Sequence, residues 1–304
     1  MAKLNEEQIR KQLKALRKTT HKEVDEEIEK TKAVLEEANR REEAKEETAR
    51  EQLKDAGVSI EALEQEEEKE ANEAGERIKK QREELIGGRS ALAADLEHHA
   101  LEKAVAPGAE AARASLVGRE LYASDARFLT DIEGDVGNPY ATPWDPHTAN
   151  PYCWAQGGGW WNSADITIYS TFWYYFYPWA NRHFTVVPHV NFHGFYILRA
   201  DDKWWNSKYA KVECDVRVRA YQYNWKSQAV HGVINHGDDN IDLNTRFDDS
   251  RHFYYSFLAG AEDLAWIRVM VRLRAYARGS GSYAELNFAT GSANYLQVPH
   301  VHVY

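Results

Sequence analysis

Apolar and small side chains recur at steps of three and four residues along the first forty positions, and charged side chains fill the positions between them. The residues that share this spacing are Ile9, Leu13, Leu16, Thr20, Val24, Ile28, Thr31, Leu35 and Ala38. Such steps place one narrow apolar seam along an α-helix, which is typical of a coiled coil whose partner helices cover the seam. The residues predicted to make this oligomerisation contact are Ile9, Leu13, Leu16, Val24, Ile28 and Leu35.

The helical pattern is interrupted at Asp55–Ser59, where Gly57 suits the end of one helix. A second helix is predicted over residues 60–86, before a pair of glycines. The chain either folds back at the interruption as a helical hairpin or continues with a kink, and the pattern leaves both open. Shorter helices over residues 90–105 and 109–122 are predicted to form a neck.

From about Thr130 the apolar period changes from helical spacing to two. Between Val212 and Tyr221, small apolar side chains alternate with charged or aromatic ones, and the same happens over residues 267–274. Alternation of this kind is typical of a strand with one buried face. The sequence therefore predicts two amphipathic strands whose outward faces are rich in arginine.

Nearly the same hexapeptide occurs in both strands, as Val216–Tyr221 and as Val271–Tyr276. It indicates either equivalent strands of a duplicated unit or chance similarity. The outward arginines are expected to meet Glu213 and Asp215 across the sheet, since opposite charges on neighbouring strands attract.

Further strands are predicted from alternation and turn residues over 166–176, 184–190, 194–200, 229–235, 252–258, 283–288 and 295–303. About eight to ten short strands with almost no helical signal are typical of an antiparallel sandwich or jelly roll. The predicted fold class is therefore long N-terminal helices, as a coiled coil or a hairpin, followed by a C-terminal antiparallel β-sandwich of jelly-roll type.

Composition divides the chain in the same places. No Phe, Tyr, Trp, Cys or Pro precedes Pro107, and all 10 tryptophans lie from Trp144 onward. Aromatic side chains bring the largest apolar area to a core, so the leading third cannot build a broad core of its own. The predicted domains are a charged helical arm over 1–86, a helical neck over 87–129 and an aromatic-rich β-sandwich over 130–304.

Charge narrows the choice of partners. The net charge is −10, and acidic and basic residues are interleaved without a basic stripe, which argues against nucleic acid. No apolar run is long enough to span a bilayer and the start lacks a secretory signal, which favours the cytoplasm or a particle released without a signal peptide. Two cysteines, Cys153 and Cys214, do not make a disulfide framework, and their spacing leaves open whether they pair.

Adjacent tryptophans are the candidate ligand-binding residues: Trp160, Trp161, Trp204 and Trp205. Neighbours on a strand face opposite ways, so one of each pair is expected to be exposed. Exposed tryptophans on a β scaffold suit stacking against sugar rings and also anchor protein interfaces, while core packing is the alternative interpretation.

Histidines offer a candidate metal site. His300 and His302 share a strand face, as do His189 and His193 if their strand is continuous, and two such pairs brought together would suit Zn²⁺. The oxygen-rich segment Asp238–Asp242 is a candidate Ca²⁺ loop, for which a hairpin turn is the alternative. No other cofactor is predicted.

No sequence signature of a serine hydrolase, a zinc protease, a P-loop or a dinucleotide-binding fold occurs, and catalysis is not predicted. The leading hypothesis is a non-enzymatic structural or adhesive assembly protein that forms a homo-oligomer through its arm and displays β heads to a glycan or another structural protein. The alternatives are a carbohydrate-binding module and a metal-dependent enzyme that uses the four histidines.

Overall fold

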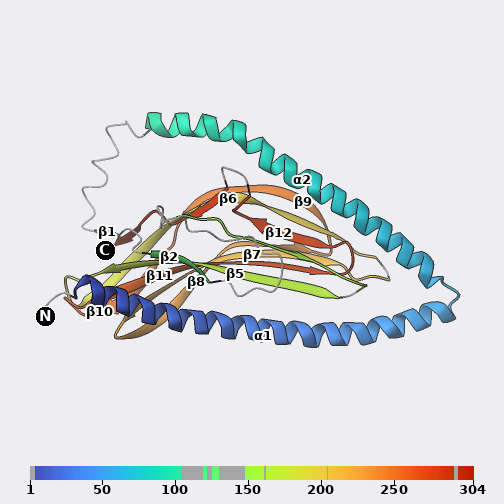
Figure 1. Ribbon diagram of the computed structural model, residues 1–304, viewed down its shortest axis with the longest axis horizontal. Coiled ribbons are helices and arrows are strands. Elements are labelled where there is room, and N and C mark those ends of the chain that lie inside the picture. The colour runs from blue at the N-terminus through green and yellow to red at the C-terminus, as the bar shows by residue number, and fades with distance from the viewer. Residues whose placement is uncertain are drawn as a thin grey trace.

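Two long helices lie on opposite sides of a β-sandwich (Figure 1). The computed structural model describes residues 4–103, 119–121, 125–129, 148–160, 162–203, 205–290 and 294–304. Helix α1 spans Glu6–Asp55 and runs along one sheet, and helix α2 spans Ile60–Lys103 and returns along the other. The break predicted near Gly57 is therefore a reversal of the chain, but the two helices are separated by the sandwich instead of packing on each other.

Local side-chain hydrogen bonds define the helix ends near this reversal and at the start of α1. The Asn5 side chain accepts from the backbone N–H of Gln8, and the Gln8 side chain accepts from that of Asn5, both at 2.9 Å. After α1, Gly57 adopts a φ of +79°, a left-handed conformation that glycine reaches without strain. Ser59 then starts α2 by accepting from the N–H of Ala62 at 3.2 Å.

Two helix predictions for the later part of the arm are wrong. Helix α2 does not stop before the glycine pair but continues to Lys103, which joins it to the segment predicted over 90–105. Glycine costs an interior helical position only about 1 kcal/mol, which neighbouring residues can offset. Residues Arg119–Leu121 form a short strand instead of ending a helix over 109–122, and the rest of that segment lies outside the described residues.

The strands form two antiparallel sheets. The five-stranded sheet has the order β2 (Asp125–Leu129), β5 (Ser163–Phe176), β11 (Ala265–Arg278), β7 (Tyr209–Gln222) and β8 (Asn224–Asp238). The nine-stranded sheet follows the path β1 (Arg119–Leu121), β14 (Val301–Val303), β6 (Arg182–Asp201), β12 (Tyr283–Asn287) and β4 (Tyr152–Gln156). Its remaining strands are β3 (Thr148–Ala149), β9 (Asn240–His252), β10 (Tyr255–Ala259) and β13 (Tyr295–Gln297). An antiparallel sandwich was predicted, although β6 is one long strand where two were expected and β9 was not foreseen.

The main core lies between the two sheets. The inward side chains of β7 and β11 are the predicted apolar sets, with Val216 and Val271 directly opposite each other and fully buried. Cys153 and Cys214 also lie in this core as free thiols, and burial raises the pKa of both. At neutral pH they therefore behave as small apolar side chains.

The apolar seam of α1 is buried on the chain's own five-stranded sheet, which corrects its assignment to partner helices. Leu13 and Leu16 pack with Trp173 and Trp266, and Ile9 lies partly buried beside them. Val24 and Ile28 pack with Tyr169 and Met270, and Leu35 is half-buried further along. Helical spacing reveals that a seam must be covered but not by what, and here the outward aromatics of β5 and β11 cover it.

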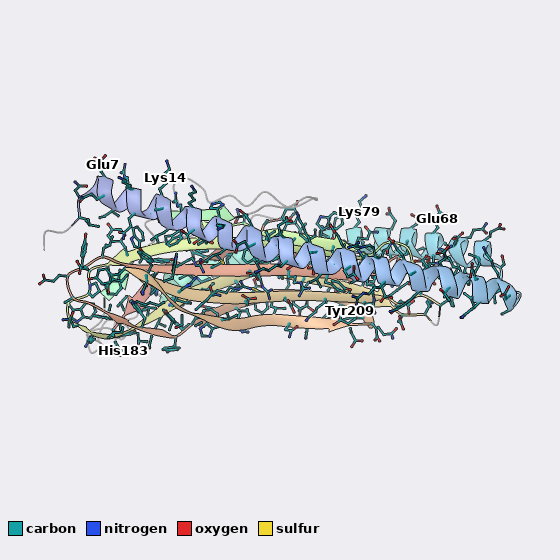
Figure 2. The ribbon with its side chains drawn as sticks, turned by 90° about the horizontal axis from the view of Figure 1, so that it is seen from below. Glu7, Lys14, Glu68, Lys79, His183 and Tyr209 are labelled. Atoms are coloured by element: carbon teal, nitrogen blue, oxygen red, sulfur yellow. The ribbon has the colours of Figure 1, made fainter. Side chains whose placement is uncertain are left out.

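Glu7 and Lys14, on the opposite side of α1 from its apolar seam, point away from the strands (Figure 2). Within the described residues, neither helix carries a stretch apolar enough and long enough to cross a bilayer.

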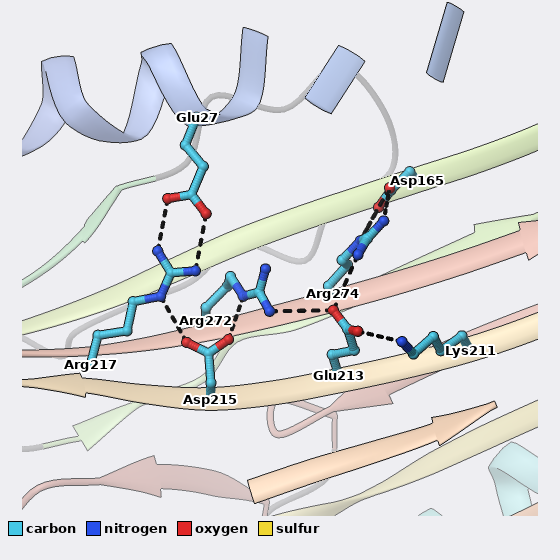
Figure 3. A network of polar contacts seen from close by, with 8 residues as sticks. All are labelled: Glu27, Asp165, Lys211, Glu213, Asp215, Arg217, Arg272 and Arg274. Carbon is cyan, nitrogen blue, oxygen red and sulfur yellow. Dashed lines mark hydrogen bonds and ion pairs between the residues drawn. The ribbon is translucent and has the colours of Figure 1, made fainter. Parts of the chain in front are cut away.

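The outward arginines of β7 and β11 meet carboxylates as predicted (Figure 3). Arg272 contacts Asp215 at 2.5 Å and Glu213 at 3.3 Å, across the β7–β11 pair. Arg217 contacts Asp215 at 2.8 Å and donates two hydrogen bonds to Glu27 of α1, at 2.7 and 3.0 Å. The network therefore ties the helix to the sheet by charge as well as by apolar contact.

Candidate functional site

A cleft of about 460 Å³ lies between α2 and the β4–β12 edge of the nine-stranded sheet. We call it the α2 cleft. Its helical wall consists of Ala71, Ala74, Gly75, Ile78, Lys79 and Arg82. Its sheet wall consists of Tyr152, Trp154, Gln156, Gly281, Ser282 and Tyr283. A volume of this size is typical of sites that take a small molecule or part of a larger one.

The alternation of β4 builds the sheet wall. Cys153 and Ala155 point into the core and are buried, so Tyr152, Trp154 and Gln156 point outward and remain partly exposed. Strand β12 pairs with β4 so that Glu285 lies opposite Trp154 and Tyr283 opposite Gln156. The strand pairing therefore places an aromatic and polar row on the outer face, beneath α2.

Trp154 and Tyr283 form a stacked pair on this wall, with ring centroids 5.9 Å apart and an interplanar angle of 23°. Tyr283 is buried while Trp154 is only partly covered, so the smaller ring supports the larger one that lines the cleft. A supported indole keeps its orientation without a ligand, which lowers the entropy cost of binding against it.

The polar end of the cleft centres on the buried carboxylate of Glu285. Its Oε2 accepts from the Arg82 guanidinium at 2.8 and 3.1 Å and from the Tyr283 hydroxyl at 2.8 Å. Its Oε1 accepts from the Asn287 amide at 2.8 Å. Burial and the adjacent Glu285 charge raise the pKa of Tyr283, so the phenol remains a donor.

The helical wall is low at Ala71, Ala74 and Gly75 because these residues are small. No atom lies within 4 Å of where a Cβ on Gly75 would be, so the space in front of this residue is open. Across the cleft, Gly281 has a φ of +78° and its missing Cβ would lie 3.6 Å from Ala71. Small side chains thus let α2 approach the 279–282 turn and still leave a cavity beside it.

The tryptophans predicted to bind a ligand do not form this site. Trp160 is only 1% exposed and lies under the Arg50 guanidinium of α1, whose central carbon is 4.3 Å from the ring centroid. It is therefore covered by the arm and is not a platform for a sugar. Trp205 is half-buried at the β6–β7 turn, and Trp161 and Trp204 lie outside the described residues.

Three of the four predicted metal-binding histidines are neighbours, and the fourth is not. The ring centroids of His189 and His300 are 5.2 Å apart, and those of His300 and His302 are 4.6 Å apart. His193 instead contacts Asp248 at 3.1 Å, because four residues along a strand span about 13 Å. His252, which was not predicted, lies against His189. Burial and the neighbouring His189 and His302 lower its pKa.

The oxygen-rich segment forms the turn between β8 and β9, as the alternative interpretation held. The Asp238 carboxylate accepts from the backbone N–H groups of Asp239 and Asn240, at 2.7 and 3.2 Å. Asp242 contacts Arg77 of α2 at 3.0 Å and Arg199 at 3.6 Å. These oxygens therefore stabilise a turn and hold a helix.

The sequence patterns do not identify the residues that line the α2 cleft, because its helical wall and its sheet wall come from distant parts of the sequence. The local signal for one wall was present, since residues 152–156 alternate apolar and outward side chains as a strand does. The position of α2 over that strand depends on tertiary contacts such as that of Arg82 with Glu285, which are 203 residues apart.

No protein-family model matches the chain. No curated protein matches it either. Among solved structures, the enzymatically active domain of tailspike protein 4 from bacteriophage CBA120 is similar over 56% of this chain and 19% of its own, with 7% identity and a TM-score of 0.21. TmCBM61 in complex with beta-1,4-galactotriose is similar over 60% of this chain and 90% of its own, with 9% identity and a TM-score of 0.21. A CBM4 structure covers 45% of this chain and 86% of its own, with 8% identity and a TM-score of 0.16. Likeness at these TM-scores supports no transfer of function.

Proposed function

We propose that this chain is a non-catalytic binding protein whose α2 cleft takes a neutral oligosaccharide. The observation that carries the proposal is the partly covered Trp154 ring, supported by Tyr283 in a stacked pair, on the wall of a 460 Å³ cleft. The faces of aromatic rings are electron-rich, so they attract the positively polarised C–H groups on the flat side of a sugar ring.

Hydrogen-bonding groups at the rim suit sugar hydroxyls. Lys79 and Gln156 are exposed side chains that line the same cleft, and the Arg82 guanidinium lies at its polar end. The charge of Arg82 is matched by Glu285, which favours a neutral ligand over an anion. A few donors beside an aromatic wall are the usual composition of a small-molecule site.

Self-association through the apolar seam of α1 is less favourable as a function, because this seam is already buried on the sheet. Leu13 and Leu16 would have to leave Trp173 and Trp266 before they could contact a partner helix. The homo-oligomer foreseen from the sequence stays a prediction, and it would need a surface other than this seam.

A glycan array followed by calorimetry tests the proposal. The intact chain should bind one class of neutral oligosaccharide, and Trp154→Ala should weaken that binding at least roughly tenfold through loss of stacking. Gly75→Leu should abolish binding from the opposite wall, because its side chain would enter the open space of the cleft without displacing any atom near its Cβ.

Tyr254→Ala is the matched control, since this ring is 66% exposed and does not line the cleft. It should bind as the unaltered chain does. An array without any signal, or equal losses for Tyr254→Ala and Trp154→Ala, would sink the proposal.

A further inference from the structure

A row of histidines crosses the outer face of the nine-stranded sheet at a distance from the α2 cleft. Strand pairing places His189 of β6 directly opposite His252 of β9. The backbone N–H of His189 donates to the backbone carbonyl of His300 at 3.2 Å. The ring centroids of His189 and His252 are 4.4 Å apart, and His300 lies on the other side of His189. Three separate segments thus bring imidazoles to one place.

Two polar side chains, those of Asn191 and Ser250, surround the Nε2 atom of His189. The amide nitrogen of Asn191 donates to the Gln297 side chain at 3.2 Å, so the Asn191 oxygen faces the other way. That oxygen lies 2.8 Å from His189 Nε2 and accepts from the Ser250 hydroxyl at 2.8 Å, and this hydroxyl also lies 2.8 Å from Nε2. Because an amide oxygen only accepts, the His189 tautomer that donates from Nε2 to Asn191 is the one that leaves a lone pair on Nδ1.

This lone pair faces His252. His189 Nδ1 and His252 Nε2 are 2.9 Å apart, which is close to the separation of roughly 3.3 Å expected for two imidazole nitrogens on one tetrahedral zinc ion. A metal-binding histidine commonly donates its other N–H to an oxygen, as His189 does to Asn191. In the metal-free chain this contact is a hydrogen bond between the two rings, and a metal ion would take the place of its proton once His252 carries its proton on Nδ1.

We propose that His189 and His252 bind one divalent first-row transition-metal ion, with Zn²⁺ as the reference ion and His300 as a third ligand. Among the described residues, no three or more His, Cys, Asp or Glu side chains already surround one point. The His300 ring therefore has to rotate toward the ion from its present place 5.2 Å from the His189 ring, and water completes the coordination. The metal would join β6 and β9 to the segment that leads into β14.

Calorimetric titration of the full chain with Zn²⁺, after chelator treatment and without a histidine tag, tests this site. One ion should bind per chain above pH 7, and binding should fall away below about pH 6 as the imidazoles are protonated. With Co²⁺ as the probe, visible absorption should report nitrogen ligands in low coordination number.

Matched variants separate this site from scattered surface histidines. His252→Ala and His252→Gln should each weaken binding at least roughly tenfold, and Asn191→Leu should do so by about 10- to 100-fold through loss of the outer hydrogen bond. His193→Ala should bind normally, because His193 lies on the same face but contacts Asp248. Absence of stoichiometric binding, or an equal loss in His193→Ala and His252→Gln, would overturn the proposal.

Discussion

A buried carboxylate depends on the donors around it, and Glu285 has donors from two strand neighbours and from α2. Its side chain is 1% exposed, whereas that of Arg82 is 38% exposed. Removal of the arginine would leave a charge in a site that water reaches poorly. The two residues thus hold α2 to the sheet at the polar end of the cleft.

We expect Arg82→Met to lower the free energy of unfolding by about 2–3 kcal/mol, less than the cost of breaking a fully buried pair, because Arg82 is half-exposed and Tyr283 and Asn287 still hydrogen-bond Glu285. Urea denaturation measures the change. Arg77→Met is the matched control on the same helix, since the Arg77–Asp242 pair is 52% and 46% exposed and should contribute less than about 1 kcal/mol. Equal losses in the two variants would contradict the burial argument.

Sequence patterns predict contacts between residues where the partners lie on regular elements that pair with each other. The meeting of Arg272 with Asp215 followed from alternation on two paired strands. The burial of Trp160 under Arg50 did not, because no pattern states that a helix 110 residues earlier in the chain will cross that turn. Contacts between distant elements carry no local periodicity.

At the scale of elements, the helical reversal is joined to the tip of the sandwich by a polar cluster. Glu67 of α2 is 8% exposed and accepts from the amide of Asn206, which is 1% exposed. Glu70 contacts Lys203 and Lys208, both at 3.2 Å. Burial raises the pKa of Glu67 to about 7, with Lys208 opposing the shift. The cluster therefore includes one carboxyl group that titrates near neutrality.

This shift makes the attachment of α2 dependent on pH. Between pH 4.5 and 7 the folded chain keeps a proton on Glu67 that the unfolded chain has lost, so stability falls as pH rises through this window. Glu67→Gln, which is neutral throughout, should match the unaltered chain near pH 4.5 and exceed its stability by up to about 3 kcal/mol at pH 8.

Chemical denaturation across that pH range checks the effect. Glu68→Gln is the control, because Glu68 is next to Glu67 on the same helix but its carboxylate is exposed. A stability difference between Glu67→Gln and the unaltered chain that stays constant with pH would refute the assignment.

The sequence predicts which segments form helices and strands better than it predicts which of these elements pack together. The α1 seam and the strand faces of β7 and β11 follow from spacing alone, and both are present. Strand β9 was not foreseen, because its side chains alternate only between half-buried and exposed, without a strongly apolar face. The mistaken partner of the α1 seam has the same origin, since an apolar stripe fits a sheet as well as another helix.

At the scale of the whole molecule, the division into arm, neck and head at residues 86 and 129 stays a prediction. It rested on the lack of aromatic residues in the arm, which holds for the sequence. In the structure, aromatic side chains from the C-terminal half pack on the arm, because Trp173 and Trp266 cover Leu13 and Leu16. Because the apolar contacts of α1 are with the sheet, its stability comes from tertiary packing, and α1 should not remain helical after the sheet unfolds.

We therefore expect α1 and the sandwich to unfold in one cooperative step. Far-UV circular dichroism, which follows the helices, and tryptophan fluorescence, which follows the sheets, should give the same midpoint in urea. Leu16→Ala should lower both midpoints together by a loss of about 2–5 kcal/mol, since Leu16 is 4% exposed within the shared cluster. Lys14→Ala, at an exposed position of the same helix, should leave both unchanged within error. A helical signal lost at lower urea than the fluorescence change would show that the arm folds apart from the head, as composition alone suggested.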